Sequence, residues 1–217
     1  PKPISMDAGS GMHTNVSLWK KDENTFYDKD EELELSQTGR YFCGGVMEHA
    51  KGLTAITNPT TNSYHRLVPG YEAPVYIAWS SSNRSATIRI PGHFKGEKYA
   101  FMKRMEYRVP DPASNPYLVF SAVLAAGLDG IKKKIEPGDP VKEDIYKMTK
   151  SERKKHGIDT LPANLGRALD ELESDRKYLN PIFSNEVLDK IIELERRDHR
   201  EIAIRPHPHE FYLYFDV

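Results

Sequence analysis

The sequence predicts an α+β fold in which the strands lie in the first part of the chain. Polar and apolar residues alternate in ATIRIP, Ala86 to Pro91, and in MEYRV, Met105 to Val109, which is the pattern of half-buried strands. Apolar residues recur at helical spacing from Leu35 to Leu53. After Glu136 the sequence consists mainly of amphipathic helical patterns such as LGRALDELESDRKYL and SNEVLDKIIELERRDHREIAI. We therefore expect strands and helices over residues 1–135 and a mainly helical region over residues 136–217.

The elements up to Pro91 follow from local patterns. HTNVSLW, His13 to Trp19, predicts a strand, and the period of two would place His13, Asn15 and Ser17 on one face. Ser36 is suited to cap the helix predicted over Leu35–Leu53. The stretch from Asn58 to Pro91 is rich in Gly, Pro and short polar residues, which predicts loops around the strand that Pro91 ends.

The following segment predicts a strand, a loop and a helix. In MEYRV, Glu106 and Arg108 would project to the same face of the strand. Asn115 is a possible N-cap, and Pro116 is a good first residue for the Ala- and Leu-rich helix that follows. That helix ends in a lysine run, which is typical of a solvated helix end and favourable to the helix dipole. EPGDP, from Glu136, is typical of a linker.

Composition excludes several classes of protein. The chain has 217 residues, 31 Lys plus Arg, 32 Asp plus Glu and a formal net charge of −1, so no overall field favours a nucleic acid or a membrane surface. Cys43 is the single cysteine, which rules out a disulfide within the chain or a zinc site of several cysteines and suits a reducing cytoplasm. The longest apolar runs are too short to span a bilayer. The sequence begins at Pro1 without an initiating Met.

Four arginines lie in or beside the predicted strands and tight loops: Arg66, Arg84, Arg89 and Arg108. Guanidinium groups bind carboxylates and phosphates through two parallel hydrogen bonds. Glu72 is the only acidic residue between Arg66 and Arg89, so these arginines would repel one another if they converged. A bound polyanion would remove that repulsion.

Two candidate metal ligands accompany the arginines. His13 follows the glycines of DAGSGMHTN, and Glu106 shares a strand face with Arg108. Taken alone, His13 is best interpreted as a hydrogen-bonded histidine after a glycine turn. Glu106 and Arg108, taken alone, are best interpreted as a pair that neutralise each other. Together with the arginines, however, the set suggests phosphoryl transfer, in which catalysis consists mainly of positioning and charge neutralisation. The Walker A pattern and the kinase loop motifs are absent from the sequence.

A succession of longer motifs carries a family resemblance. The segments are GSGMH, NPTTNSYHRLVPGYEAPVYIAWS, NRSATIRIP, EYRVPDPASNPYL and GLDGIKKKI, and the chain ends in HPHEFYLYFDV. They resemble the C-terminal catalytic segment of glutamine synthetase, type I, over essentially the whole chain. The resemblance implies a curved, mostly antiparallel sheet backed by helices, with His13, Ser17, Arg89, Glu106 and Arg108 on its concave face.

The resemblance also implies a reaction and its cofactors. The family makes glutamine from L-glutamate, ammonia and ATP. ATP phosphorylates the γ-carboxylate of glutamate, and ammonia then displaces phosphate from the γ-glutamyl phosphate. Two divalent cations, Mg²⁺ or Mn²⁺, organise the phosphates. The family works as a homo-oligomer, a dodecameric pair of rings, with no nucleic acid or membrane partner.

Site roles follow from the same resemblance, position by position. His13 matches a ligand of the metal nearer the ATP phosphates, and Glu106 matches a ligand of the other metal. Arg66 matches the arginine that holds the substrate carboxylate, and Glu72 matches a flap glutamate that closes the site and helps to deprotonate ammonium. The remaining matches are Arg84 and Arg89 at the transferring phosphoryl group and ATP phosphates, Arg108 near the γ-glutamyl group, Gly9 in the glutamate loop, and Asn15 and Ser17 at the nucleotide.

Three departures from the family pattern keep alternatives open. Ala8 stands where the family commonly has Asn before Gly, Asn15 replaces the second His of an HxH pattern, and the segment between Arg89 and Glu106 is longer than is common in bacteria. A related ligase that joins another amine to a γ-glutamyl group therefore remains an alternative. A non-catalytic ring-forming homologue is a second one, and the retained His13, Glu106 and arginines argue against it.

The resemblance also implies that the chain is part of a longer enzyme, and it raises the question of adenylylation at Tyr146. The family's N-terminal β-grasp domain and its other metal-binding glutamates would precede Pro1, so we expect a C-terminal fragment that is inactive alone. Tyr146 lies where some bacterial members carry an adenylylated tyrosine, but the acidic and proline-rich context that follows it there is absent here. We expect no such modification and interpret Tyr146 as a surface tyrosine in a loop.

Overall fold

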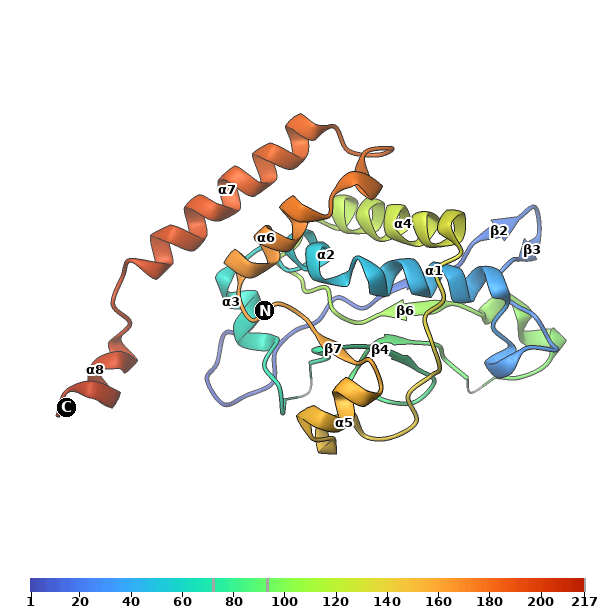
Figure 1. Cartoon of the computed structure of the whole chain (residues 1–217), viewed down its shortest axis with the longest axis horizontal. Coiled ribbons are helices and arrows are strands. Elements are labelled where there is room, and N and C mark those ends of the chain that lie inside the picture. The colour runs from blue at the N-terminus through green and yellow to red at the C-terminus, as the bar shows by residue number, and fades with distance from the viewer. Residues whose placement is uncertain (72, 93, 217) are drawn as a thin grey trace.

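The protein has an α+β architecture in which a layer of helices covers one face of a sheet (Figure 1). The computed structural model describes residues 1–71, 73–92 and 94–216. Within these residues, five strands form one sheet in the order β1-β6-β5-β4-β7. Their bounds are β1 Thr14–Val16, β4 Tyr76–Ser80, β5 Ala86–Arg89, β6 Met105–Tyr107 and β7 Asp159–Thr160.

The sheet is mostly antiparallel, as expected. Neighbouring strands run antiparallel except for β4 and β5, which are parallel. The predicted strand over residues 13–19 is shorter than expected, because β1 stops at Val16 and Trp19–Lys20, which is β2, pairs instead with β3, Glu23–Asn24. The strands predicted in ATIRIP and MEYRV are confirmed as β5 and β6.

The register of β1, β6 and β5 separates a polar face from an apolar one. Asn15 lies opposite Glu106, and Glu106 lies opposite Arg89, so these side chains form a row on one face. Tyr107 pairs with Ile88 on the other face, and both are fully buried. Side chains alternate between the two faces along a strand. Burial of Tyr107 and Ile88 on the apolar face therefore places their neighbours Glu106 and Arg89 on the polar face.

Three helices cover the apolar face: α1 Gln37–Glu48, α2 Ala50–Thr57 and α4 Pro116–Lys133 (Figure 1). The predicted caps are confirmed, since the Ser36 side chain accepts a hydrogen bond from the Gly39 amide and Asn115 accepts one from Tyr117. Close contact between α1 and α4 requires glycine. A Cβ atom on Gly45 would lie 2.2 Å from the Ala126 carbonyl oxygen.

The helix predicted over residues 35–53 is divided at His49, which joins α1 to α2. The buried His49 ring is held between two carboxylates, with Nδ1 at 2.5 Å from Asp175 and Nε2 at 2.9 Å from Asp129. It also stacks on Tyr178 at a centroid distance of 3.7 Å. Burial alone would lower the pKa of His49, but its hydrogen bonds with Asp175 and Asp129 outweigh burial and raise it.

The stretch predicted as loops contains a helix. α3 spans Thr61–Arg66 and begins in a capping box, in which Thr60 accepts from the Ser63 amide and the Ser63 side chain accepts from the Thr60 amide. The short polar residues that suggested a loop therefore start a helix. This helix carries Arg66 at its last position, with the side chain buried.

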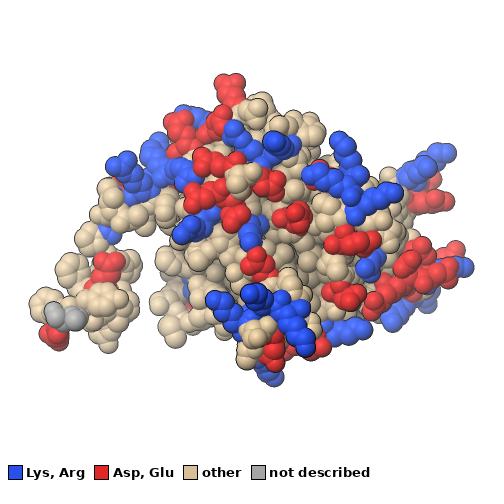
Figure 2. All heavy atoms as spheres, viewed as in Figure 1, with Lys and Arg blue, Asp and Glu red and all other residues tan. Residues whose placement is uncertain are grey.

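Helices predominate after Glu136, as predicted. They are α5 Lys150–Lys155, α6 Leu165–Ser174, α7 Asn185–Ala203 and α8 Pro208–Tyr214, and short 3₁₀ helices lie at Glu32–Glu34 (η1), Glu97–Met102 (η2), Ile145–Lys147 (η3) and Lys177–Leu179 (η4). α8 stands apart from the rest of the molecule at the end of an arm that α7 begins (Figures 1 and 2). None of the helices in the described residues combines the length and apolar character needed to cross a membrane.

Candidate functional site

Glu106 lies at the centre of a cluster of cationic side chains on the polar face of the sheet. Its Oε1 atom is 3.0 Å from His13 Nδ1 and 3.4 Å from Arg108 Nε, and its Oε2 atom is 2.8 Å from Arg89 Nη2. Glu106 is only 6% exposed. His13 and Arg89 are distant from Glu106 in the sequence, and the strand register brings them to its carboxylate. Arg108 follows Glu106 by two positions along the chain.

The environment of this cluster favours the binding of an anion. Within the described residues, the buried Nε atom of Arg89 has no hydrogen-bond partner, and that of Arg108 has only the ion pair with Glu106 at 3.4 Å. Burial, followed by the positive charge of Arg108, lowers the pKa of His13 although Glu106 acts in the opposite direction. The imidazole is thereby kept neutral, and neutral imidazole is the form that ligates a metal.

Arg66 is held against the backbone that follows β6. Its guanidinium donates from Nη1 to the Val109 carbonyl at 2.7 Å and from Nη2 to the Arg108 carbonyl at 3.2 Å. Gly11 makes this position possible, since a Cβ atom there would lie 2.5 Å from Arg66 Nη2. A guanidinium has five N–H donors, so further donors remain for a ligand.

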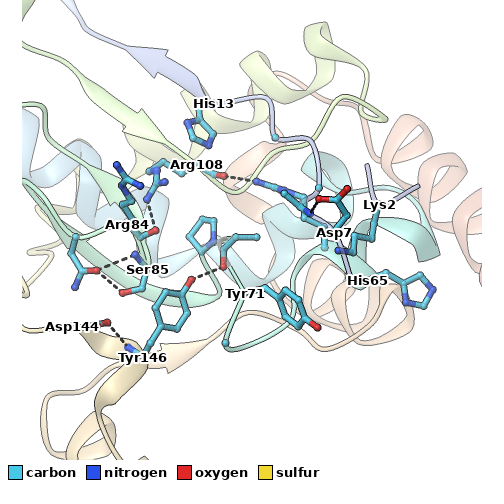
Figure 3. Close-up of a pocket in the computed structure, with 18 of the residues that line it drawn as sticks. Lys2, Asp7, His13, His65, Tyr71, Arg84, Ser85, Arg108, Asp144 and Tyr146 are labelled. Carbon is cyan, nitrogen blue, oxygen red and sulfur yellow. Dashed lines mark hydrogen bonds between the residues drawn. The ribbon is translucent and has the colours of Figure 1, made fainter. Parts of the chain in front are cut away.

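A cavity of about 1020 Å³ opens beside these residues. Of the predicted site residues, Gly9, His13, Arg66, Arg84 and Arg108 line it. Figure 3 shows His13, Arg108 and Arg84 along one side of the cavity and Tyr146 and Tyr71 across from them. Arg84 lies in the loop between β4 and β5, and its carbonyl oxygen accepts a hydrogen bond from the Arg108 guanidinium.

The other predicted residues that the structure describes do not line this cavity. Arg89 borders a second, smaller cavity of about 80 Å³ together with Arg104. Asn15 lies beside it, because its Oδ1 atom accepts a hydrogen bond from Arg104 Nε at 2.9 Å. Ser17 is half-buried between β1 and β2, and its hydroxyl accepts from the Trp19 indole at 3.0 Å. Glu72 lies outside the described residues, so its predicted role stays a prediction.

The donor chemistry at Glu106 and His13 suits a divalent cation. A carboxylate oxygen and an imidazole nitrogen are both ligands of Mg²⁺ or Mn²⁺ sites, and here they face each other at 3.0 Å. The described residues nowhere assemble three His, Cys, Asp or Glu side chains into one such group. The described residues therefore offer part of a ligand set, and a complete octahedral site needs further oxygen donors.

Sequence reasoning missed several residues that line the large cavity, among them Tyr71, Asn83, Ser85, Asp144 and Tyr146. Tyr146 was expected to be a surface tyrosine in a loop, but it is half-buried in the 3₁₀ helix η3, and its hydroxyl donates to the Ala73 carbonyl at 3.0 Å. Asp144 in DIY was an available signal, because its side chain caps η3.

The arrangement defines a class of protein: a domain that gathers arginines, a histidine and a carboxylate around a cavity suited to a phosphorylated or carboxylate ligand. Family comparison matches residues 1–214 to "Glutamine synthetase, catalytic domain". The chain therefore belongs to the glutamine synthetase family.

Individual relatives agree with this assignment. The chain is 56% identical over 218 residues to a glutamine synthetase of Sulfolobus acidocaldarius, with 100% of this chain and 46% of the relative covered. It is 48% identical over 221 residues to that of Archaeoglobus fulgidus, with 100% and 44% covered. The chain thus spans about half the length of these relatives.

Solved structures show the same fold. A structure described as a GmaS/ADP complex superposes with a TM-score of 0.86 at 36% identity, covering 100% of this chain and 48% of the other. The glutamine synthetase of Plasmodium falciparum gives a TM-score of 0.84 at 32% identity, covering 99% and 48%.

Proposed function

We propose that this chain supplies the phosphate- and glutamate-binding part of a glutamine synthetase active site, which ligates ammonia to L-glutamate with ATP. The observation that carries the proposal is the Glu106 cluster, in which one buried carboxylate contacts His13, Arg89 and Arg108. His13 and Arg108 line a cavity large enough for a substrate, and Arg89 borders the smaller one. Catalysis of phosphoryl transfer requires this kind of fixed positive charge more than it requires covalent chemistry.

The position of each residue at the two cavities suggests which part of the substrates it would bind. Arg66 would hold a substrate carboxylate, and Arg108 would lie near the γ-glutamyl group, because both guanidinium groups are buried in the cavity wall. Arg84 lies at the cavity and Arg89 beside the smaller one, which suits contacts with the transferring phosphoryl group and the ATP phosphates. Asn15 and Ser17 would contact the nucleotide.

Mg²⁺ or Mn²⁺ would be held in part by His13 and Glu106. When bound, the cations would neutralise charge that develops on the phosphates. The structure adds that Glu106 also orients Arg89 and Arg108, so one carboxylate would organise both the metal and the guanidinium groups. Glu72 would close the site and help to deprotonate ammonium, and Gly9 would keep the glutamate loop close to Arg66, since a Cβ atom there would lie 3.1 Å from Arg66 Cγ.

The experiment that tests this function uses the full-length protein. ADP release should require glutamate and ammonium together, and glutamine should form in equal amount. A related ligase that uses another amine is the second candidate, because Ala8 lines the cavity where the family commonly has Asn. Methylamine or ethylamine in place of ammonium separates the two. Failure to bind both nucleotide and Mn²⁺ would instead favour a non-catalytic homologue.

Assembly is a further part of the proposal. Aromatic residues are exposed along α8 and just beyond it: Phe211, Tyr212, Tyr214 and Phe215. An unpartnered group of this kind is typical of an interaction site. We propose that the enzyme works in the cytoplasm as a homo-oligomer, a dodecameric ring pair, and light scattering of the full-length protein would give the mass that tests it.

A further inference from the structure

The segment from Gly138 to Tyr146 runs alongside β4 and reaches the mouth of the large cavity. Its start is fixed by the Trp79 indole, which donates to the Gly138 carbonyl at 3.0 Å, and by the Val141 amide, which donates to the Trp79 carbonyl at 2.9 Å. The sequence suggested a linker beginning at Glu136. The structure instead ties this segment to the sheet at several points.

Glu143, in the second half of this segment, fixes the loop that carries Arg84. The Asn83 side chain donates from Nδ2 to the Glu143 carbonyl at 2.6 Å. Its Oδ1 atom accepts from the Ser85 amide at 3.0 Å and from the Ser85 hydroxyl at 2.5 Å. Arg84 therefore lies between Asn83, which is bonded to the segment, and Ser85, which is bonded to Asn83.

Tyr146, the last residue of the segment, fixes a second part of the cavity wall, at Ala73. The Tyr146 hydroxyl donates to the Ala73 carbonyl at 3.0 Å (Figure 3). The Tyr146 ring packs edge-on against Tyr76 at a centroid distance of 5.8 Å. Asp144 accepts from the Tyr146 amide at 3.1 Å and so sets the orientation of η3. Residues 143–146 thus bind both walls, one through Asn83 and one through Ala73.

We propose that Tyr146 is a positioning residue, whose hydroxyl holds the wall at Ala73 in place across the cavity from Arg84. This inference rests on the proposed function, because it concerns the retention of a reactive γ-glutamyl phosphate. A wall that moves away would admit water to the acyl phosphate and would loosen the glutamate site. Tyr146 touches no reacting atom in this role and acts through the backbone of Ala73.

A tyrosine-to-phenylalanine substitution isolates the hydroxyl. The ring contact with Tyr76 remains, and the hydrogen bond that is lost is a neutral one, with a net contribution to stability of only about 1 kcal/mol. The melting temperature should therefore change little. Displacement of a substrate-positioning segment by about 1 Å can nevertheless cost on the order of a hundredfold in rate.

The test compares full-length wild-type protein with the Tyr146→Phe variant. ADP release and glutamine formation are measured together, and KM is determined for glutamate and for ATP. We expect the ratio of ADP to glutamine and the KM for glutamate each to rise about threefold, with the KM for ATP unchanged. Tyr178→Phe is the matched control, because Tyr178 is a buried tyrosine outside the cavity whose hydroxyl has no hydrogen-bond partner in the described residues.

The outcomes separate this inference from the proposed function. A wild-type protein that forms glutamine, with a Tyr146→Phe variant that matches it in ratio and in both KM values, would overturn the inference alone. Equal changes in both KM values together with a lowered melting temperature would show a purely structural role and overturn it as well. A wild-type protein that forms no glutamine would overturn the proposed function and the inference with it.

Discussion

His13 and Glu106 face each other across adjacent strands, with His13 Nδ1 3.0 Å from Glu106 Oε1. The pairing of Asn15 with Glu106 in β1 and β6 sets this contact, since His13 precedes Asn15 by one strand period. A site built on strand register tolerates little displacement, because a one-residue slip would turn Glu106 toward the apolar layer. The pairing of β1 with β6 therefore positions the two candidate metal ligands, and the pairing of β5 with β6 places Arg89 on the other side of Glu106.

Removing the Glu106 carboxylate should weaken binding of the divalent cation. In the full-length protein we expect Glu106→Ala to lower Mn²⁺ affinity about a hundredfold or more and to remove most activity, because a hard anionic ligand is lost. Titration calorimetry with Mn²⁺ measures the affinity directly. Glu106→Gln is the matched control of equal size, which keeps an acceptor for Arg89 and Arg108 but loses the charge. Unchanged Mn²⁺ affinity in both variants would remove Glu106 from the metal site.

Replacing Arg66 by lysine should not be conservative. Lysine keeps the charge but loses the planar fork of donors. Loss of one charge-assisted hydrogen bond costs about 1.5–3 kcal/mol, so we expect the KM for glutamate to rise about tenfold or more with the KM for ATP nearly constant. Steady-state kinetics of the full-length variant provide the measurement. Because Arg66 also donates to the Val109 carbonyl, equal increases in both KM values with a lower melting temperature would mean that it acts only on the backbone.

Glu72→Ala should instead affect the second step of the reaction, in which ammonia displaces phosphate from the γ-glutamyl phosphate. We expect glutamate binding to persist while the reaction with ammonia slows, so that more acyl phosphate is lost to water and ATP is hydrolysed without glutamine formation. The ratio of phosphate released to glutamine formed measures this uncoupling. A slower variant that keeps the wild-type ratio would contradict the flap role.

Features set by residues close together in the sequence could be predicted, and features set by residues far apart in the sequence could not. Asn115 and Pro116 start α4 as predicted because a helix cap acts within one turn, and alternation alone located β5 and β6. The division of α1 from α2 was missed because the two carboxylates that hold His49 come from distant helical segments. The contact of Tyr146 with Ala73 was missed for the same reason, since the two residues are 73 positions apart.

The His49 cluster should make the stability of the protein depend on pH. The pKa of His49 is raised in the folded state, so its contribution is fully present below the unfolded value of about 6.5 and is lost as the pH rises through the folded value. We expect His49→Gln to cost about 3 kcal/mol at pH 6 and clearly less at pH 9, because at low pH a buried ion pair is broken. Melting temperatures at both pH values, with Asp129→Asn as a second variant, provide the measurement. An equal loss at both pH values would show that the imidazolium charge is not involved.

Glu195, in α7, should also make the protein less stable as the pH rises. Burial raises the pKa of Glu195 to about 8, and within the described residues its Oε2 atom is buried without a hydrogen-bond partner. The folded protein therefore binds a proton that the unfolded chain releases near pH 4.3, so this carboxyl lowers stability progressively as the pH rises from about 4.3 to about 8. Glu195→Gln cannot ionise, so we expect it to match the wild type at pH 5 and to melt at a higher temperature at pH 8. Glu193→Gln, an exposed neighbour on the same helix, is the control. A Glu195→Gln variant that melts no higher than wild type at pH 8 would show that this carboxyl is solvated or paired in the assembled protein.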